Sequence, residues 1–267
     1  MNRLLKFEFR KLFRQKSFYI CGAVMIGLIL LSAFTMNLLL DMSQSMMESS
    51  DGVSVAITGN DYGVSGLYML ATALSNSNFS IVFAIFASLF VCSDYTNGTL
   101  KNVIARGYGR VPIYASKYIV SLIAATIYTI FCWIAGFLSG TAFWGVGSLL
   151  ENDTAWSFIS ILLLQLLAVY AYTSMFFLIS ALLKKTGGAI AVGIVAPLVI
   201  IMIISMIDAL LHNESFSILD YWLDNCFVNV SAISVSSDIM VRCLVCFLIY
   251  TVLFTVGGHL IGSKNEV

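Results

Sequence analysis

Six long apolar stretches, separated by short polar segments, constrain this 267-residue chain more than any other feature. A helix needs about 20 apolar residues to cross the hydrocarbon core of a bilayer. Only 10% of the residues are charged, whereas soluble domains carry about 25%. We therefore expect an all-α polytopic membrane protein with a single transmembrane domain over residues 1–267. The six predicted spans cover residues 18–40, 66–93, 112–141, 156–183, 187–211 and 239–261.

The second predicted span has the least regular sequence. Its most apolar part, "FSIVFAIFASLFVCS", is too short to cross a bilayer alone, and the polar run "SNSN" at 75–78 precedes it. We expect the helix to extend back through "GLYMLATAL" and so to begin near residue 66.

The lysines and arginines lie almost entirely on one side of this topology. All of them except Arg242 fall in the N-terminal segment, between spans 2 and 3, between spans 4 and 5, or in the C-terminal tail. Basic loops stay on the cytoplasmic side of a membrane, so both termini are expected in the cytoplasm and the chain in the cell membrane. The net charge is zero, and no charge imbalance indicates a nucleic-acid partner.

The first 17 residues combine basic and apolar positions. On a helical wheel Leu5, Phe9, Leu12 and Phe13 share one face, and basic side chains occupy another. This pattern predicts an amphipathic helix over residues 1–17 that lies in the headgroup region. The alternative is a plain basic anchor that holds the N-terminus inside.

The segment "CSDYTNGTLKNVIARGYGR", residues 92–110, has more internal structure than a linker requires. Asp94 ends the second span and is a candidate helix cap, with Thr96 and Asn97 as competing caps. An apolar face, a C-terminal glycine and a following proline complete the pattern of a short helix over residues 97–106. The residues concerned are Leu100, Val103, Ile104, Gly107 and Pro112.

At these residues the chain resembles the permease subunits of type-two ABC transporters, which are mostly exporters. In that family an acidic residue after the second span precedes a glycine-threonine pair, which opens a coupling helix that docks on the ATPase subunit. The matching positions here are Asp94, Gly98, Thr99, Leu100, Lys101, Val103, Ile104, Arg106, Arg110 and Lys117. The family's acid is usually glutamate, and the arginine pattern here carries an extra glycine in "RGYGR".

The resemblance implies a chain that forms half of a membrane pathway, paired with a second copy or a related permease. The sequence has no phosphate-binding G-x-x-x-x-G-K-[ST] loop. ATP and Mg would therefore bind a separate ATPase subunit, and this chain would not be an enzyme. By the same resemblance, the substrate would be an antimicrobial peptide, a lantibiotic or a small drug, and the biology resistance or immunity.

Polar residues within the spans are the candidates for lining such a pathway, because polar groups in lipid normally face protein or water. Hydrogen bonding between helices is the alternative for each of them. They are Asn37, Asn76, Asn78, Gln165 and Asp208. No cluster of residues indicates a catalytic site or a metal site: Cys243 and Cys246 have metal-ligand spacing but lie in an apolar helix without a second pair.

Two further alternatives stay open. The segment before the last span mixes acids with aromatic residues, which predicts a segment that sits at the outer interface or dips into the protein between helices, or else a gate at the exit of a pathway. The whole chain could instead be a non-transporting scaffold or regulatory subunit that docks a cytoplasmic partner. The basic segment 92–110 could also serve only to attract anionic lipid headgroups.

Overall fold

The computed structural model describes residues 2–51, 64–74, 77–96, 98–146, 152–211, 217–231 and 236–264. Within these ranges every regular element is a helix and none is a strand. The elements are α1 (Asn2–Arg14), α2 (Lys16–Asp51), α3 (Gly66–Thr72), α4 (Ser77–Thr96), α5 (Thr99–Ala105), α6 (Arg110–Trp144), α7 (Asn152–Leu183), α8 (Thr186–Leu211), the 3-10 helix η1 (Leu219–Tyr221), α9 (Leu223–Val230) and α10 (Ser237–Lys264).

Six of these helices have segments long and apolar enough to cross a membrane, which confirms the predicted fold class of an all-α polytopic membrane protein. Helix α4 is largely buried, whereas the outward surfaces of the other five are rich in exposed Leu, Ile, Val and Met side chains, as expected for contact with lipid. The six segments in the described part of the chain are Lys16–Met42, Phe79–Thr96, Val111–Trp144, Phe158–Leu183, Thr186–Leu211 and Ser237–Leu260.

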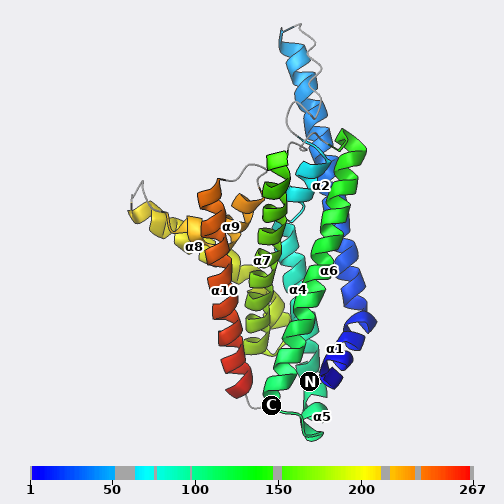
Figure 1. Ribbon diagram of the computed structural model, residues 1–267, viewed down its shortest axis with the longest axis vertical. Coiled ribbons are helices and arrows are strands. Elements are labelled where there is room, and N and C mark those ends of the chain that lie inside the picture. The colour runs from blue at the N-terminus through cyan, green and yellow to red at the C-terminus, as the bar shows by residue number, and fades with distance from the viewer. Residues whose placement is uncertain are drawn as a thin grey trace.

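The long helices form a bundle, and α1, α5 and the last turn of α10 lie at one end of it (Figure 1). We call this the basic end. Helices α2, α4, α6 and α7 enclose the core, where Phe18, Phe83, Phe86 and Tyr128 pack ring against ring. The Tyr128 hydroxyl also donates to the Phe18 carbonyl at 2.7 Å. Aromatic packing therefore joins the first three membrane-spanning helices.

The prediction of one continuous helix over residues 66–93 is wrong. The segment forms two helices, α3 and α4, and only Phe79–Thr96 is long and apolar enough to span. The Ser65 side chain accepts a hydrogen bond from the Tyr68 amide and so caps α3. At the other end of α3, the Gln165 amide donates to the Ala71 carbonyl at 2.6 Å. A side chain from α7 thus hydrogen-bonds the backbone at the C-terminal end of α3.

Helix α3 lies close against α6 because both helices carry glycine at the contact. A Cβ added at Gly136 would come 2.7 Å from the Met69 carbonyl oxygen, and one added at Gly140 would come 2.8 Å from the Gly66 Cα. The Gly66 amide also donates to the Gly145 carbonyl at 2.9 Å. Small residues allow this backbone approach in membrane bundles.

The predicted N-terminal helix is α1, and the face that it buries against the bundle differs from its predicted apolar face. Phe13 is 42% exposed, and the most buried positions are Leu4, Glu8 and Leu12. The buried face therefore carries an acid among apolar residues, and Lys11 lies beside it in the helix. The charged side chains of this helix are therefore not all on its outer face, and Lys11 forms an ion pair with Asp94 inside the protein.

Candidate functional site

A buried ionic cluster at the basic end connects four helices through Asp94. Its carboxylate forms ion pairs with Lys11 of α1 and Lys117 of α6. It also accepts a hydrogen bond from the Thr99 hydroxyl of α5 at 2.8 Å. Asp94 itself lies in the last turn of α4. One side chain therefore joins the first residue of α5 to α1, α4 and α6.

The surroundings of the cluster exclude water. The Asp94 and Lys117 side chains are 7% and 5% exposed, and the Phe90 ring between the two lysines is fully buried. The lysine Nζ atoms lie 5.5 Å (Lys11) and 5.9 Å (Lys117) from the centre of that ring, within range of a cation–π attraction. Low polarity around an ion pair strengthens it but makes the loss of either partner costly.

Glu8 supplies a second carboxylate in this region. It is 4% exposed and lies one turn before Lys11 in α1. Burial lowers the pKa of Lys11, and the negative charge of Glu8 opposes that effect. Two lysines and two acids thus give the cluster no net charge, which is the arrangement that a buried ionic site requires.

The prediction that Asp94 caps the next helix is wrong. The residue that precedes α5 is Gly98, with no side-chain cap, and Asp94 accepts a hydroxyl rather than a helix amide. Thr96 does not cap α5 either, because its hydroxyl donates back to the Cys92 carbonyl at 3.1 Å. Asn97, the third candidate, lies outside the described residues.

Two glycines define the ends of α5. Gly98 has φ +65° and Gly107 has φ +84°, in the left-handed region that only glycine adopts at low cost. The Gly107 amide donates to the Ile104 carbonyl at 2.9 Å and so closes the helix. Pro112 stands in the first turn of α6, where its missing amide costs nothing.

A groove of about 320 Å³ lies between α1 and α5 on the surface of the basic end. Both arginines and apolar side chains line the groove. Of the resemblance-derived positions, Thr99, Val103 and Arg106 line this groove, and Leu100 and Ile104 are half-buried. The Lys101 and Arg110 side chains lie outside the described part of the structure. The full lining is Arg3, Leu4, Phe7, Thr99, Val103, Arg106 and Tyr108.

The predicted pathway residues do not come together in the described part of the chain. Asn37 donates to Asp41 one turn later, at 3.3 Å on an exposed surface. Gln165 is fully buried, bonded to the Ala71 carbonyl and to the Trp133 indole at 3.0 Å. Gln165 therefore forms hydrogen bonds between helices, and Asn37 forms a local hydrogen bond within α2. Asn76 and the side chain of Asn78 fall outside the described residues.

Asp208, the last pathway candidate, organises the chain that follows α8. It accepts the Ser217 hydroxyl at 2.6 Å and the Ile218 and Leu219 amides at 2.9 Å each. Those amides belong to the start of η1. Asp208 therefore works as a cap for a neighbouring segment, from a position ten residues earlier in the sequence.

Sequence reasoning missed Lys11 and Glu8 as members of the site and treated Lys117 only as a flanking charge. One signal was available: Leu4, Glu8 and Leu12 recur every four residues, which places the acid on the same face as two leucines. The pairing of Lys11 with Asp94, 83 residues away, follows only from the packing of α1 against the bundle.

A match to a known protein family extends over nearly the whole bundle. Residues 20–267 match the family described as protein of unknown function, DUF2705. The chain belongs to this family. No curated protein matches it. The DUF2705 match includes Asp94, Thr99 and Lys117, and it begins after α1. The family description assigns no activity.

Proposed function

We propose that this chain is the membrane-spanning permease subunit of an ATP-binding cassette exporter, and that α5 docks on a separate ATPase subunit. The observation that carries the proposal is the attachment of α5 to Asp94. Through Thr99, Asp94, Lys11 and Lys117, a short surface helix is linked to three helices of the bundle. A linker between two spans has no need of such a connection.

The cluster is suited to transmit displacement. The Asp94 carboxylate has little freedom, because two ammonium groups and a hydroxyl hold its oxygens in a buried site. A push on α5 would therefore act on α4 and α6 together instead of bending a flexible loop. Rigid shifts of packed helices are a common means of coupling in transport and signalling proteins.

The outer surface of α5 is compatible with a protein partner. Ala105 and Arg106 at its C-terminal end are exposed, and Arg106 shares the groove with Arg3 and Phe7. An acidic side chain of the partner would be attracted by the two arginines while an apolar one filled the groove. ATP and Mg would bind that partner.

The remaining assignments follow from charge and from the resemblance to ABC permeases. The positive-inside rule favours a cytoplasmic location for the basic end, and so for both termini in the cell membrane. A second copy of the chain or a related permease would complete the pathway. The substrate would be an antimicrobial peptide, a lantibiotic or a small drug, exported for resistance or immunity.

The experiment compares two exposed arginines of the basic end, Arg106 at the C-terminal cap of α5 and Arg14 at the end of α1. The tagged chain is purified in mild detergent together with its ATPase, and the bound ATPase is quantified. We expect Arg106→Glu to reduce it at least tenfold and Arg14→Glu to leave it within twofold. Equal reductions would indicate a general attraction to anionic lipid, and an unchanged Arg106→Glu complex would refute docking through α5.

A non-transporting scaffold is the alternative, and the same purification distinguishes it. In that case Arg106→Glu would release a partner that binds no nucleotide. Recovery of such a partner in place of an ATPase would overturn the transporter assignment while leaving the role of α5 as a docking element.

A further inference from the structure

The short helix α9 places a half-buried acid against the middle of a membrane-spanning helix. The Tyr172 hydroxyl donates to the Asp224 carboxylate. Tyr172 lies in the middle of the span Phe158–Leu183, eleven residues from its nearer end, which corresponds to roughly 16 Å of helix. Asp224 is therefore held near the centre of the membrane. An ionisable residue at this depth is expensive and marks a functional site by default.

Helix α9 enters the bundle through its apolar face. Leu223, Cys226, Phe227 and Val230 are all buried and recur with helical spacing. Asp224 directly follows the buried Leu223 in this helix, so it lies next to the buried face. Of the alternatives for this segment, the packing of α9 agrees with a segment that dips between helices, but Asp224 was not singled out in advance.

Asp224 has neutral partners, whereas Asp94 and Asp220 have cations. Tyr172 and the Trp222 indole, the latter at 2.8 Å, donate to it. Within the described part of the chain, no lysine or arginine forms an ion pair with Asp224, while Asp94 binds two lysines and Asp220 binds Arg242 at 3.1 Å. The negative charge of Asp224 is thus stabilised by hydrogen bonds but not neutralised by the protein.

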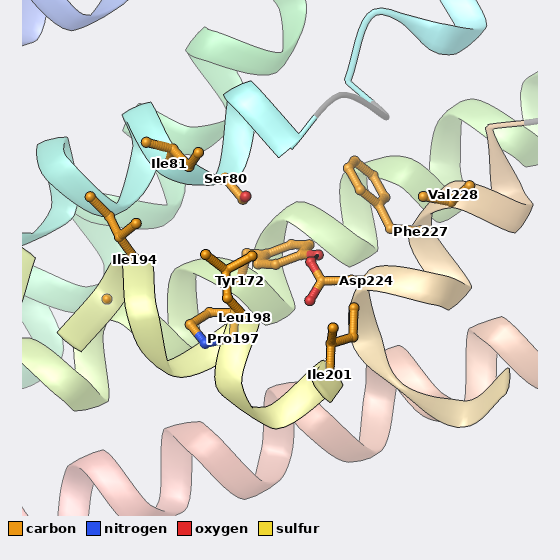
Figure 2. Close-up of a pocket in the computed structure, with 11 residues that line it drawn as sticks. Ser80, Ile81, Tyr172, Ile194, Pro197, Leu198, Ile201, Asp224, Phe227 and Val228 are labelled. Carbon is orange, nitrogen blue, oxygen red and sulfur yellow. Dashed lines mark hydrogen bonds between the residues drawn. The ribbon is translucent and has the colours of Figure 1, made fainter. Parts of the chain in front are cut away.

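A cavity of about 240 Å³ lies against this carboxylate, between α4, α7, α8 and α9. Figure 2 shows Asp224 and Tyr172 pointing toward each other among the apolar side chains that line it. Most of the wall is apolar, with Ile81, Leu198, Ile201 and Phe227 as its main surfaces. The volume equals that of about eight water molecules at about 30 Å³ each, enough for a small aromatic amine.

Helix α8 forms one wall of the cavity around a proline. Pro197 stands inside α8 and has no amide hydrogen to donate to the carbonyl of Gly193, one turn earlier. Both residues line the cavity. The wall that α8 contributes is therefore largely apolar, and the Asp224 carboxylate on the opposite side attracts a hydrogen-bond donor with positive charge.

These observations select the chemical class of the ligand. An anion would be repelled by Asp224, and a neutral apolar molecule would leave its charge uncompensated. A metal ion would require further ligands, and the described residues include no group of three His, Cys, Asp or Glu that could hold one. The rings of Tyr172 and Phe227, 5.7 Å apart, add a face that attracts cations.

We propose that this cavity binds an apolar organic monocation, such as an aryl-alkyl ammonium, with Asp224 as its counter-charge. The binding site itself stands independently of the transport assignment. That the bound cation is the exported substrate, or the cationic side chain of a larger one, rests on the proposed function.

The test measures binding of radiolabelled phenethylammonium to the purified full-length chain in detergent, by equilibrium dialysis without ATPase or ATP. We expect saturable binding to the wild type that is at least tenfold weaker in Asp224→Asn. Asparagine removes the charge and keeps one acceptor oxygen, so it loses one of the two hydrogen bonds from Tyr172 and Trp222, which bind different oxygens. Asp238→Asn, an exposed acid in the first turn of α10, should leave affinity within twofold.

Two further measurements test the charge of the ligand and the volume of the cavity separately. Phenethyl alcohol, which has the same aromatic body without the charge, should compete at least tenfold more weakly than unlabelled phenethylammonium. Ile201→Phe narrows the cavity while retaining Asp224, and should weaken binding even if Asp224→Asn fails to fold. Equal affinity of the wild type and these variants, or no saturable binding to the wild type, would overturn the site. Neither result would alter the ATPase association measured with Arg106→Glu.

Discussion

At the scale of single residues, Asp94 has the largest consequences for the structure. It lies at the end of a membrane-spanning helix and has one partner on each of three other helices. Removing its charge would leave Lys117 buried without its counter-ion. The loss of one member of a buried ion pair costs about 3–5 kcal/mol, so the residue has a structural role whatever binds to α5.

We therefore predict that Asp94→Asn lowers the free energy of unfolding in detergent by about 3–5 kcal/mol. Thermal unfolding followed by circular dichroism measures the effect. Asp41→Asn is the matched control, because Asp41 is an exposed acid whose only described contact is with Asn37, and its change should stay within about 0.5 kcal/mol.

A double substitution tests whether the buried charge of Lys117 causes the loss of stability. In Asp94→Asn combined with Lys117→Met, the buried ammonium is removed together with the carboxylate. Part of the lost stability should return, since replacing a whole buried ion pair by apolar groups is often neutral. If Asp94→Asn were as stable as Asp41→Asn, the cluster would not be the connection described here.

The sequence identified some of these residues and missed others for a physical reason. Gly98, Thr99 and Asp94 are neighbours along the chain, and their pattern was readable as a helix start. Lys11 and Lys117 reach the same point from α1 and α6, and charge counting recognised them only as contributions to orientation. Asp224 was missed because the acid's depth depends on how α9 packs against α7, which local sequence does not encode.

At the scale of elements, the break between α3 and α4 is the main departure from the predicted topology. The sequence is apolar on both sides of "SNSN", and hydropathy therefore favours one continuous helix. The structure instead stabilises the break with Gln165 from α7 and with close packing of α3 on α6. Tertiary contacts supplied by distant segments outweigh the local preference for a continuous helix.

The α3–α6 contact gives a second stability prediction. A Cβ at Gly136 would meet the Met69 carbonyl oxygen and the Ala73 Cβ at 2.7 and 2.8 Å. Gly136→Ala should therefore force the helices apart and cost about 1–3 kcal/mol. The control is Gly27→Ala in α2, where nothing lies within 4 Å of the added atom and the better helix propensity of alanine should make the change neutral or stabilising.

Thermal unfolding in the same detergent compares these two glycine variants. A contradictory result would be equal stability of both, which would mean that α3 shifts on α6 without loss. In that case the glycines would not explain why residues 66–72 fold separately from α4.

At the scale of the whole molecule, composition and charge were sufficient for the fold class but not for the mechanism. Six apolar stretches and few charged residues predicted a polytopic helical protein, and the six apolar helices bear this out. The concentration of lysine and arginine toward one end of the bundle follows from sequence alone. What could not be read from the sequence is the buried connection between that end and the bundle.

The central claim is that a nucleotide-hydrolysing subunit binds the basic end, and photolabelling tests it most directly. The wild-type tagged chain is purified from its native membrane in mild detergent and irradiated with azido-ATP in the presence of Mg. The account predicts one labelled partner that carries a P-loop, near one copy for each copy of this chain. A purified chain with no nucleotide-labelled partner would contradict it.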